Sequence, residues 1–168
     1  MSFKELNLNE IEKINPFNLI GNDWMLITSG NEGNFNTMTA SWGGLGVLWN
    51  KKVAFSFVRP QRYTFEFMEE NELFTLSFFD AKHKDALRLC GRKSGRDCDK
   101  IKEAGLTPFF EDNAPCFEEA KMILVCKKIY SQFISPECMI DKSLEKNYEN
   151  KDYHKMFVGE ILKCLVRD

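Results

Sequence analysis

Three short runs of this chain combine hydroxyl, amide and guanidinium side chains, and two of them also contain glycines. They cover Asn36 to Gly44, Val58 to Thr64 and Leu89 to Asp97. Hydroxyls and amides hydrogen-bond the edge of a heterocycle, a guanidinium binds phosphate through two parallel hydrogen bonds, and glycine lets the backbone approach a ligand closely. The three runs therefore indicate a binding site for a flat ligand that carries negative charge.

The run from Asn36 to Gly44 predicts contacts to the ring of such a ligand. Asn36, Thr37 and Thr39 offer polar groups to a heterocycle edge and a polyol chain. Trp42 has a face that packs on an aromatic ring, and the two glycines after it would expose backbone amides at the end of a strand. Taken alone, the run also fits an edge strand whose hydroxyls face water.

Arg59 and Arg62 flank the predicted start of a helix and predict the position of a phosphate. The first backbone N–H groups of a helix are unpaired and lie at the positive end of its dipole, so they favour an anion. Either arginine would supply the bidentate contact, and Thr64 would add a donor. The alternative is that both arginines are solvated surface charges.

Between Gly91 and Lys100 the chain has the composition of a mobile basic loop. Glycine-rich loops beside an active site often control access to it, and positive charge attracts an anionic dinucleotide. Ser94 and Gly95 are the loop residues expected at the ligand. The alternative is an ordinary connection between two helices.

Alternating and apolar patterns predict the elements that must position these runs. Strands are expected over residues 24–28, 35–42, 53–58, 73–79, 109–110, 121–133 and 156–166, with a hairpin connection at 30–34. Helices are expected over residues 61–70, 81–90 and 97–104, ended by Asn71, Gly91 and Gly105. A polar loop is expected over residues 136–152.

The size of the chain predicts one α+β domain spanning residues 1–168. With 168 residues and 43% hydrophobic content, the chain can bury one good core. Residues 1–15 form a polar amphipathic arm. Its apolar side chains are expected to lie on the body of the domain: Leu6, Leu8, Ile11 and Ile14.

The charge balance gives no indication of a nucleic-acid or membrane partner. A net charge of −2 arises from 23 basic and 25 acidic residues, and no apolar run approaches the ~20 residues of a membrane span. The first residues lack the apolar stretch of a signal peptide. We therefore expect a cytoplasmic protein.

The cysteines and histidines do not have the spacing of a metal site. The six cysteines never form a Cys-x-x-Cys pair, and His83 and His154 lie near none of them in sequence. We expect no metal and mostly buried, reduced thiols, with His154 at the surface or an interface. Cys98 is the alternative, a redox-sensing thiol whose pKa the basic neighbours Arg96 and Lys100 would lower.

Together the three runs resemble the flavin reductase-like family, and within it the flavoredoxin-type branch. The resemblance extends from about Asn15 to Val166 and includes the segments Glu103 to Pro108 and Asp152 to Met156. It implies a split β-barrel, antiparallel with Greek-key topology and short helices, that holds FMN non-covalently and works as a homodimer.

The resemblance also implies which residues contact FMN. It points to Asn36, Met38, Thr39, Ala40, Trp42, Arg59, Thr64 and Lys100, and the chemistry of the runs adds Thr37, Ser41, Arg62, Ser94 and Gly95. Lys100 is expected at the pyrimidine end of the flavin, where a cation favours the negative charge left by reduction. No side chain receives a catalytic role beyond the flavin itself. Relatives often have a histidine near the position of Cys138, so this chain departs from the family pattern there.

The function implied is transfer of a hydride from NAD(P)H to flavin N5, followed by electron transfer to a flavin, a metal or a protein acceptor. No Gly-x-Gly-x-x-Gly motif is present, so the flavin face and the dimer cleft would hold the nicotinamide. Two alternatives remain open: an FMN electron-carrier module without significant NAD(P)H turnover, and a barrel that binds no flavin.

Overall fold

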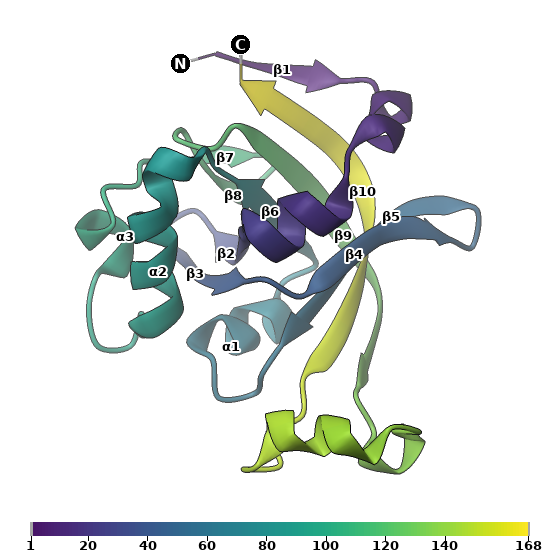
Figure 1. Cartoon of the computed structure of the whole chain (residues 1–168). Helices are drawn as coiled ribbons and strands as arrows, with labels where there is room; N and C mark the ends of the chain where they lie inside the picture. The colour runs from purple at the N-terminus through teal and green to yellow at the C-terminus, as the bar shows by residue number, and fades with distance from the viewer. Residues whose placement is uncertain (1, 168) are drawn as a thin grey trace.

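Antiparallel strands make up most of the protein, whose computed structural model describes residues 2–167 (Figure 1). The main sheet has the order β3-β2-β6-β9-β10-β5-β4, and β1 pairs with β10. Its strands are β1 (Phe3–Leu6), β2 (Met25–Asn31), β3 (Asn34–Ala40), β4 (Gly43–Leu48), β5 (Lys51–Val58), β6 (Leu73–Phe78), β9 (Met122–Phe133) and β10 (Lys155–Arg167). A separate hairpin joins β7 (Pro108–Glu111) to β8 (Ala114–Phe117).

The two strands at the ends of this order, β3 and β4, follow each other in the chain. Only Ser41 and Trp42 separate them, so the first run of the sequence lies at the open seam of the sheet. The long strand β10 forms the opposite part of the sheet. It pairs with β9 along most of its length, with β5 through its first half and with β1 through its last residues.

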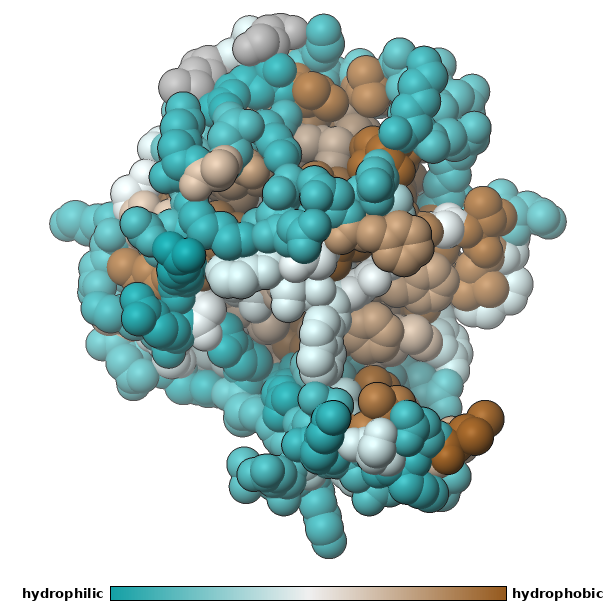
Figure 2. All heavy atoms as spheres, in the orientation of Figure 1, coloured by the Kyte–Doolittle hydropathy of each residue, from teal (hydrophilic) through white to brown (hydrophobic). Residues whose placement is uncertain are grey.

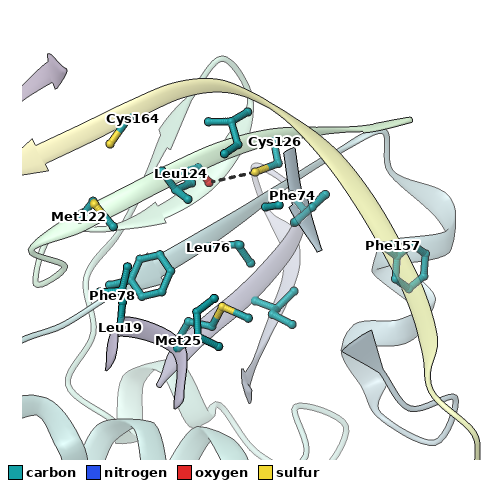
Figure 3. Packing of buried hydrophobic residues seen from close by; sticks show 14 of the residues in the cluster. Leu19, Met25, Phe74, Leu76, Phe78, Met122, Leu124, Cys126, Phe157 and Cys164 are labelled. Atoms are coloured by element: carbon teal, nitrogen blue, oxygen red, sulfur yellow. Dashed lines mark hydrogen bonds between the residues drawn. The ribbon is translucent and has the colours of Figure 1, made fainter. Parts of the chain in front are cut away.

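The sheet encloses an apolar core that includes Phe74, Leu124 and Phe157 (Figure 3). Gly159 on β10 makes this packing possible, because a Cβ atom there would lie 2.5 Å from the Phe74 ring. The β10–β9 register shifts between Val158 and Gly159, which bends the strand around the core. Strand β10 therefore packs against large core side chains at a position where it has no side chain of its own.

Short helices surround the seam. The α-helices are α1 (Tyr63–Glu70), α2 (Lys84–Arg92) and α3 (Lys100–Glu103), and the 3-10 or π-helical segments are η1 (Leu8–Lys13), η2 (Phe17–Asn22), η3 (Ala81–His83), η4 (Pro136–Cys138) and η5 (Lys142–Tyr148). Figure 1 shows α1, α2 and α3 on the same side as β3, and an excursion with η4 and η5 that projects below the barrel. Both α1 and α2 pack against β3.

The N-terminal arm lies on the body as expected. Ile11 is buried, and Leu6, Leu8 and Ile14 pack against the barrel core. The arm also contributes strand β1, which the sequence did not predict. Phe3 pairs with Arg167, so the two ends of the described chain lie side by side.

Two predicted element ends were wrong because the glycines there were taken as signs of a turn. In the structure they allow close packing of the backbone. The expected strand 35–42 ends at Ala40, and the glycines after it open strand β4, which pairs with β5. A Cβ atom on Gly43 would lie 2.7 Å from the Phe55 carbonyl oxygen. Gly91 does not end its helix, which continues to Arg92; a Cβ atom there would lie 3.4 Å from the Thr39 side chain.

Three further expectations on the elements were incomplete. Strand β8 was not predicted, the expected helix 97–104 is only the single turn α3, and the polar loop 136–152 contains η4 and η5. Trp24 precedes β2 in a left-handed conformation with φ +68°. The helical turns η1 and η2 were not predicted either, whereas β2, β5, β6, β7, β9, β10, α1 and α2 lie where the sequence predicts them, with ends shifted by a few residues.

The cysteines form no disulfide. All six are free, and four are buried: Cys90, Cys116, Cys126 and Cys164. The expected low pKa of Cys98 is wrong, because partial burial and the neighbouring Glu103 raise the pKa of that thiol. Within residues 2–167 no group of three or more potential ligand side chains suits a metal ion, and no helix has the length and hydropathy to span a membrane.

Candidate functional site

A hollow of about 210 Å³ opens at the seam, and we call it the β3 hollow. Its floor is the end of β3 and the two-residue link to β4. The lining residues are Met38, Thr39, Ala40, Ser41, Trp42, Phe57, Arg59, Arg62 and His154. The apolar and aromatic members suit a flat ring, and the two arginines give the hollow positive charge.

One wall of the β3 hollow is a buried histidine beneath an exposed tryptophan. The Trp42 and His154 rings lie 5.1 Å apart, and His154 Nδ1 is 3.0 Å from the Tyr148 hydroxyl. Burial, together with the charge of Arg59, lowers the pKa of His154 to about 4. His154 is therefore neutral at pH 7 and adds no charge to the hollow.

Arg59 reaches the β3 hollow with part of its hydrogen-bonding capacity already used. Its Nη1 donates to the Asp152 carboxylate at 2.5 Å and its Nη2 to the Asn147 carbonyl at 2.9 Å. The hydrogen bond from Arg59 lowers the pKa of Asp152. Arg59 thereby connects the seam to the excursion between β9 and β10.

A second hollow of about 170 Å³ adjoins the first, and we call it the cationic hollow. The two share Arg62. Its lining residues are Gln61, Arg62, Tyr63, Thr64, Arg92, Lys93, Ser94 and Lys100, which include four basic side chains and no carboxylate. Helix α1 begins at this hollow, and the first N–H groups of a helix have no partner within it.

Two cations of this hollow are held by carbonyl oxygens at the end of α2. Lys100, only 3% exposed, donates to the carbonyls of Cys90 and Lys93 at 3.3 and 3.2 Å. Arg62 donates to the Gly91 carbonyl at 2.8 Å. In the described part of the chain neither side chain has an ion pair with a carboxylate.

Removal from water lowers the pKa of both cations. Desolvation lowers the pKa of Lys100 to about 8, and Arg62 adds to this effect. Desolvation also lowers the pKa of Arg62, with a further contribution from Arg59. Burying a cation without a counter-ion is unfavourable, so an anion bound in the cationic hollow would be stabilised strongly.

The loop of the third run closes over β3 beside this hollow. Asn36 donates to the Thr64 hydroxyl at 2.8 Å, and both side chains are buried. A Cβ atom on Gly95 would lie 2.2 Å from the Asn36 amide oxygen, so glycine is required for this contact. Asn36, Gly95 and Lys100 also line a larger cleft of about 730 Å³ towards α3.

A family model described as the flavin reductase like domain matches residues 17–168. The chain belongs to this family. No curated protein matches the sequence.

Solved structures of flavin reductase-like proteins share this fold at low sequence identity. An FMN-binding domain of a flavin reductases-like enzyme from Shewanella baltica is 16% identical with a TM-score of 0.70, over 98% of this chain and 77% of that chain. A flavoredoxin from Methanosarcina acetivorans is 22% identical with a TM-score of 0.68, over 87% and 69%. An NADH:FAD oxidoreductase from Streptomyces globisporus is 16% identical with a TM-score of 0.66, over 86% of this chain and 75% of that chain.

 These likenesses show a common fold.

The structure brings most of the predicted site residues of this flavin reductase-like chain to the two hollows. Residues Met38 to Trp42, with Arg59, line the β3 hollow, whereas Thr64, Ser94 and Lys100 line the cationic hollow; Arg62 lines both. Asn36 and Gly95 lie next to them in the larger cleft. Thr37 lines none of these spaces, because its hydroxyl is buried in the sheet 2.8 Å from that of Thr28.

The grouping of the basic residues differs from the one that the sequence suggested. Sequence reasoning placed Arg59, Arg62 and Thr64 together at a phosphate and Lys100 at a ring. In the structure Lys100 lies with Arg62 and Thr64, and Arg59 lies with Trp42. The order of these residues in the sequence does not predict which of them lie together, because their positions depend on where the end of α2 packs.

Sequence reasoning also missed residues of the site. Arg92 lines the cationic hollow, and His154, expected at the surface or an interface, is buried in the wall of the β3 hollow. The available signal for His154 was its position directly before the apolar strand β10, next to Asp152 and Tyr153.

Proposed function

We propose that this chain binds one FMN non-covalently across the β3 hollow and the cationic hollow, as a flavoprotein of the flavin reductase and flavoredoxin type. The observation that carries the proposal is a pair of cations, the buried Lys100 and the half-buried Arg62, without a carboxylate partner in residues 2–167. A ligand with a compact anionic group would supply the counter-charge that these two cations lack.

The cationic hollow fits the phosphate of FMN. Lys100 and Arg62 would supply charge-assisted hydrogen bonds, and Ser94 and Thr64 line the same space with hydroxyl groups. The start of α1 adds backbone N–H groups and the positive end of a helix dipole. No acidic side chain lines the hollow, so nothing there repels a dianion.

The β3 hollow fits the ring. Met38 and Phe57 offer apolar contacts, and the backbone from Thr39 to Ser41 runs beside the space. The neutral His154 and the aromatic face of Trp42 add no negative charge. Arg59 and Arg62 would favour the negative charge that a flavin gains on reduction.

The chemistry that FMN supplies is uptake of a hydride at N5 from NAD(P)H and release of electrons to a flavin, a metal or a protein acceptor. The chain contributes binding, orientation and electrostatics. An NADH:FAD oxidoreductase among the structural neighbours supports a nicotinamide donor. Oxidation of NADH and NADPH by the FMN-loaded protein separates an enzyme from an electron carrier, which would show no significant turnover.

The first test of the proposal is the identity of the bound cofactor. We expect the protein to purify yellow, and denaturation followed by chromatography to release one FMN per chain. FAD, haem or a colourless protein that ignores added FMN would contradict the proposal.

We further propose that the protein is a cytoplasmic homodimer that acts with a small-molecule or protein redox partner. The unpaired state of all six cysteines supports a reducing compartment. Large apolar side chains on the surface support the dimer, among them Phe17 at 86% exposure and Ile140 at 100%.

A further inference from the structure

A third hollow of about 340 Å³ adjoins the β3 hollow, and we call it the Trp24 hollow. It shares Thr39 and Ser41 with the β3 hollow. Its other lining residues are Trp24, Leu87, Arg88, Gly91 and Arg92. An indole and a leucine side chain thus lie in one space with two guanidinium groups, and none of the proposed FMN contacts explains this combination.

Trp24 has a backbone conformation that suits glycine better than tryptophan. It follows the C-cap residue Asp23 of the helical turn η2 and has φ +68°, in the left-handed region where bulky residues are strained. Glycine is the usual residue where a helix ends in this way. The turn requires a positive φ at position 24, but it does not require a tryptophan side chain there. Strained residues of this kind are often found at binding sites.

Lys84 fixes the orientation of the indole. Its Nζ lies 3.5 Å from the centre of the Trp24 ring system and donates to the carbonyls of Asn22 and Asp23 at 2.6 and 3.1 Å. A cation against an aromatic face is an attractive contact. The wall of the hollow is therefore held in place before any ligand binds.

The charge of the hollow favours an anion. No acidic side chain lines it, and Arg92 has no ion-pair partner within residues 2–167. Arg88 pairs only with the exposed Asp85, at 2.7 Å. A guanidinium binds a carboxylate through two parallel hydrogen bonds, so the polar end of a ligand here is best matched by a carboxylate.

We propose that the Trp24 hollow binds a small planar aromatic carboxylate. The ring would lie against Trp24 and Leu87, and the carboxylate would lie between Arg88 and Arg92. The hollow shares Thr39, Ser41 and Arg92 with the proposed FMN site, but its own ligand can be tested on the protein without FMN. Because Thr39 and Ser41 line both hollows, such a ligand would lie next to the proposed flavin ring.

The test uses benzoate as the probe and benzamide as its uncharged counterpart, titrated into the full-length protein and followed by NMR. We expect benzoate to bind at least tenfold more tightly than benzamide. Trp24→Gly should weaken benzoate binding at least tenfold and keep the fold, because glycine accepts the positive φ. Arg88→Gln should reduce the preference for benzoate over benzamide.

Trp49→Gly is the matched control. Trp49 also has a positive φ, +51°, but it lies in the β4–β5 turn and lines none of the three hollows. We expect it to bind benzoate as the unaltered protein does. Absence of benzoate binding, equal affinity for benzamide, or unchanged binding by Trp24→Gly would overturn the proposal. If Trp24→Gly does not fold, an unchanged preference in Arg88→Gln overturns it instead.

Discussion

The ammonium group of Lys100 is held in the cationic hollow by two backbone carbonyls and by no carboxylate of residues 2–167. Loss of charge-assisted hydrogen bonds to a phosphate costs about 1.5–3 kcal/mol, so Lys100→Ala should weaken FMN binding roughly ten- to a hundredfold. Riboflavin, which has no phosphate, should lose far less. Isothermal titration of both ligands measures the difference.

The same residue predicts a pH dependence. Burial lowers the pKa of Lys100 to about 8 in the protein without ligand, and a bound phosphate would raise it. FMN affinity should therefore be nearly constant between about pH 7 and 8, where the phosphate stays a dianion, and fall above pH 8 by up to about tenfold per pH unit, because binding then requires proton uptake. The Lys100→Ala variant should show no such fall.

Arg59→Ala is the control that separates the two assignments of the basic residues. Since Arg59 already binds Asp152 and Asn147, we expect a smaller selective loss of FMN than for Lys100→Ala. The opposite order, with Arg59→Ala selective for FMN and Lys100→Ala weakening FMN and riboflavin equally, would contradict our assignment. It would support the one drawn from the sequence.

At the scale of the elements, the contact between β10 and β6 leaves no room for a side chain at Gly159. A Cβ atom there would meet Phe74 at 2.5 Å and Cys126 at 2.9 Å. We expect Gly159→Ala to lower the free energy of unfolding by about 1–3 kcal/mol, measured by urea denaturation. Gly21→Ala, with nothing within 4 Å of its new Cβ, should change it by less than about 0.5 kcal/mol.

Combining Gly159→Ala with Phe74→Leu tests the cause. If the clash with the ring is responsible, the double variant should be more stable than the sum of the two single changes predicts. Strict additivity would contradict this explanation.

Elements with a clear pattern could be predicted from the sequence, and those set by backbone contacts could not. Strand β6 and helix α1 have apolar patterns of their own, and both were predicted. Strand β4 contains three glycines and reads as a loop, yet its pairing with β5 makes it a strand. The same limit holds for the site: residue types indicated an anion and a ring, but the place of Lys100 depends on carbonyls at the end of α2.

At the scale of the whole molecule, the apolar surface predicts assembly. Figure 2 shows apolar side chains gathered over part of the face seen there and at the excursion below the barrel. Trp49, Phe133 and Ile140 are among the exposed large side chains. We expect light scattering to give twice the chain mass of 19.6 kDa with FMN bound. A monomer mass with FMN still bound would contradict the homodimer.

The end of helix α2 has a further consequence for ligand binding. Its carbonyl oxygens carry the negative end of a helix dipole, and in the protein without ligand they are the partners of Lys100 and Arg62. In thermodynamic terms the carbonyl oxygens of α2 compete with a bound anion for the hydrogen bonds of these two cations. They lower the maximum affinity for a ligand, but they keep both cations in place beforehand, so little conformational entropy is lost when an anion binds.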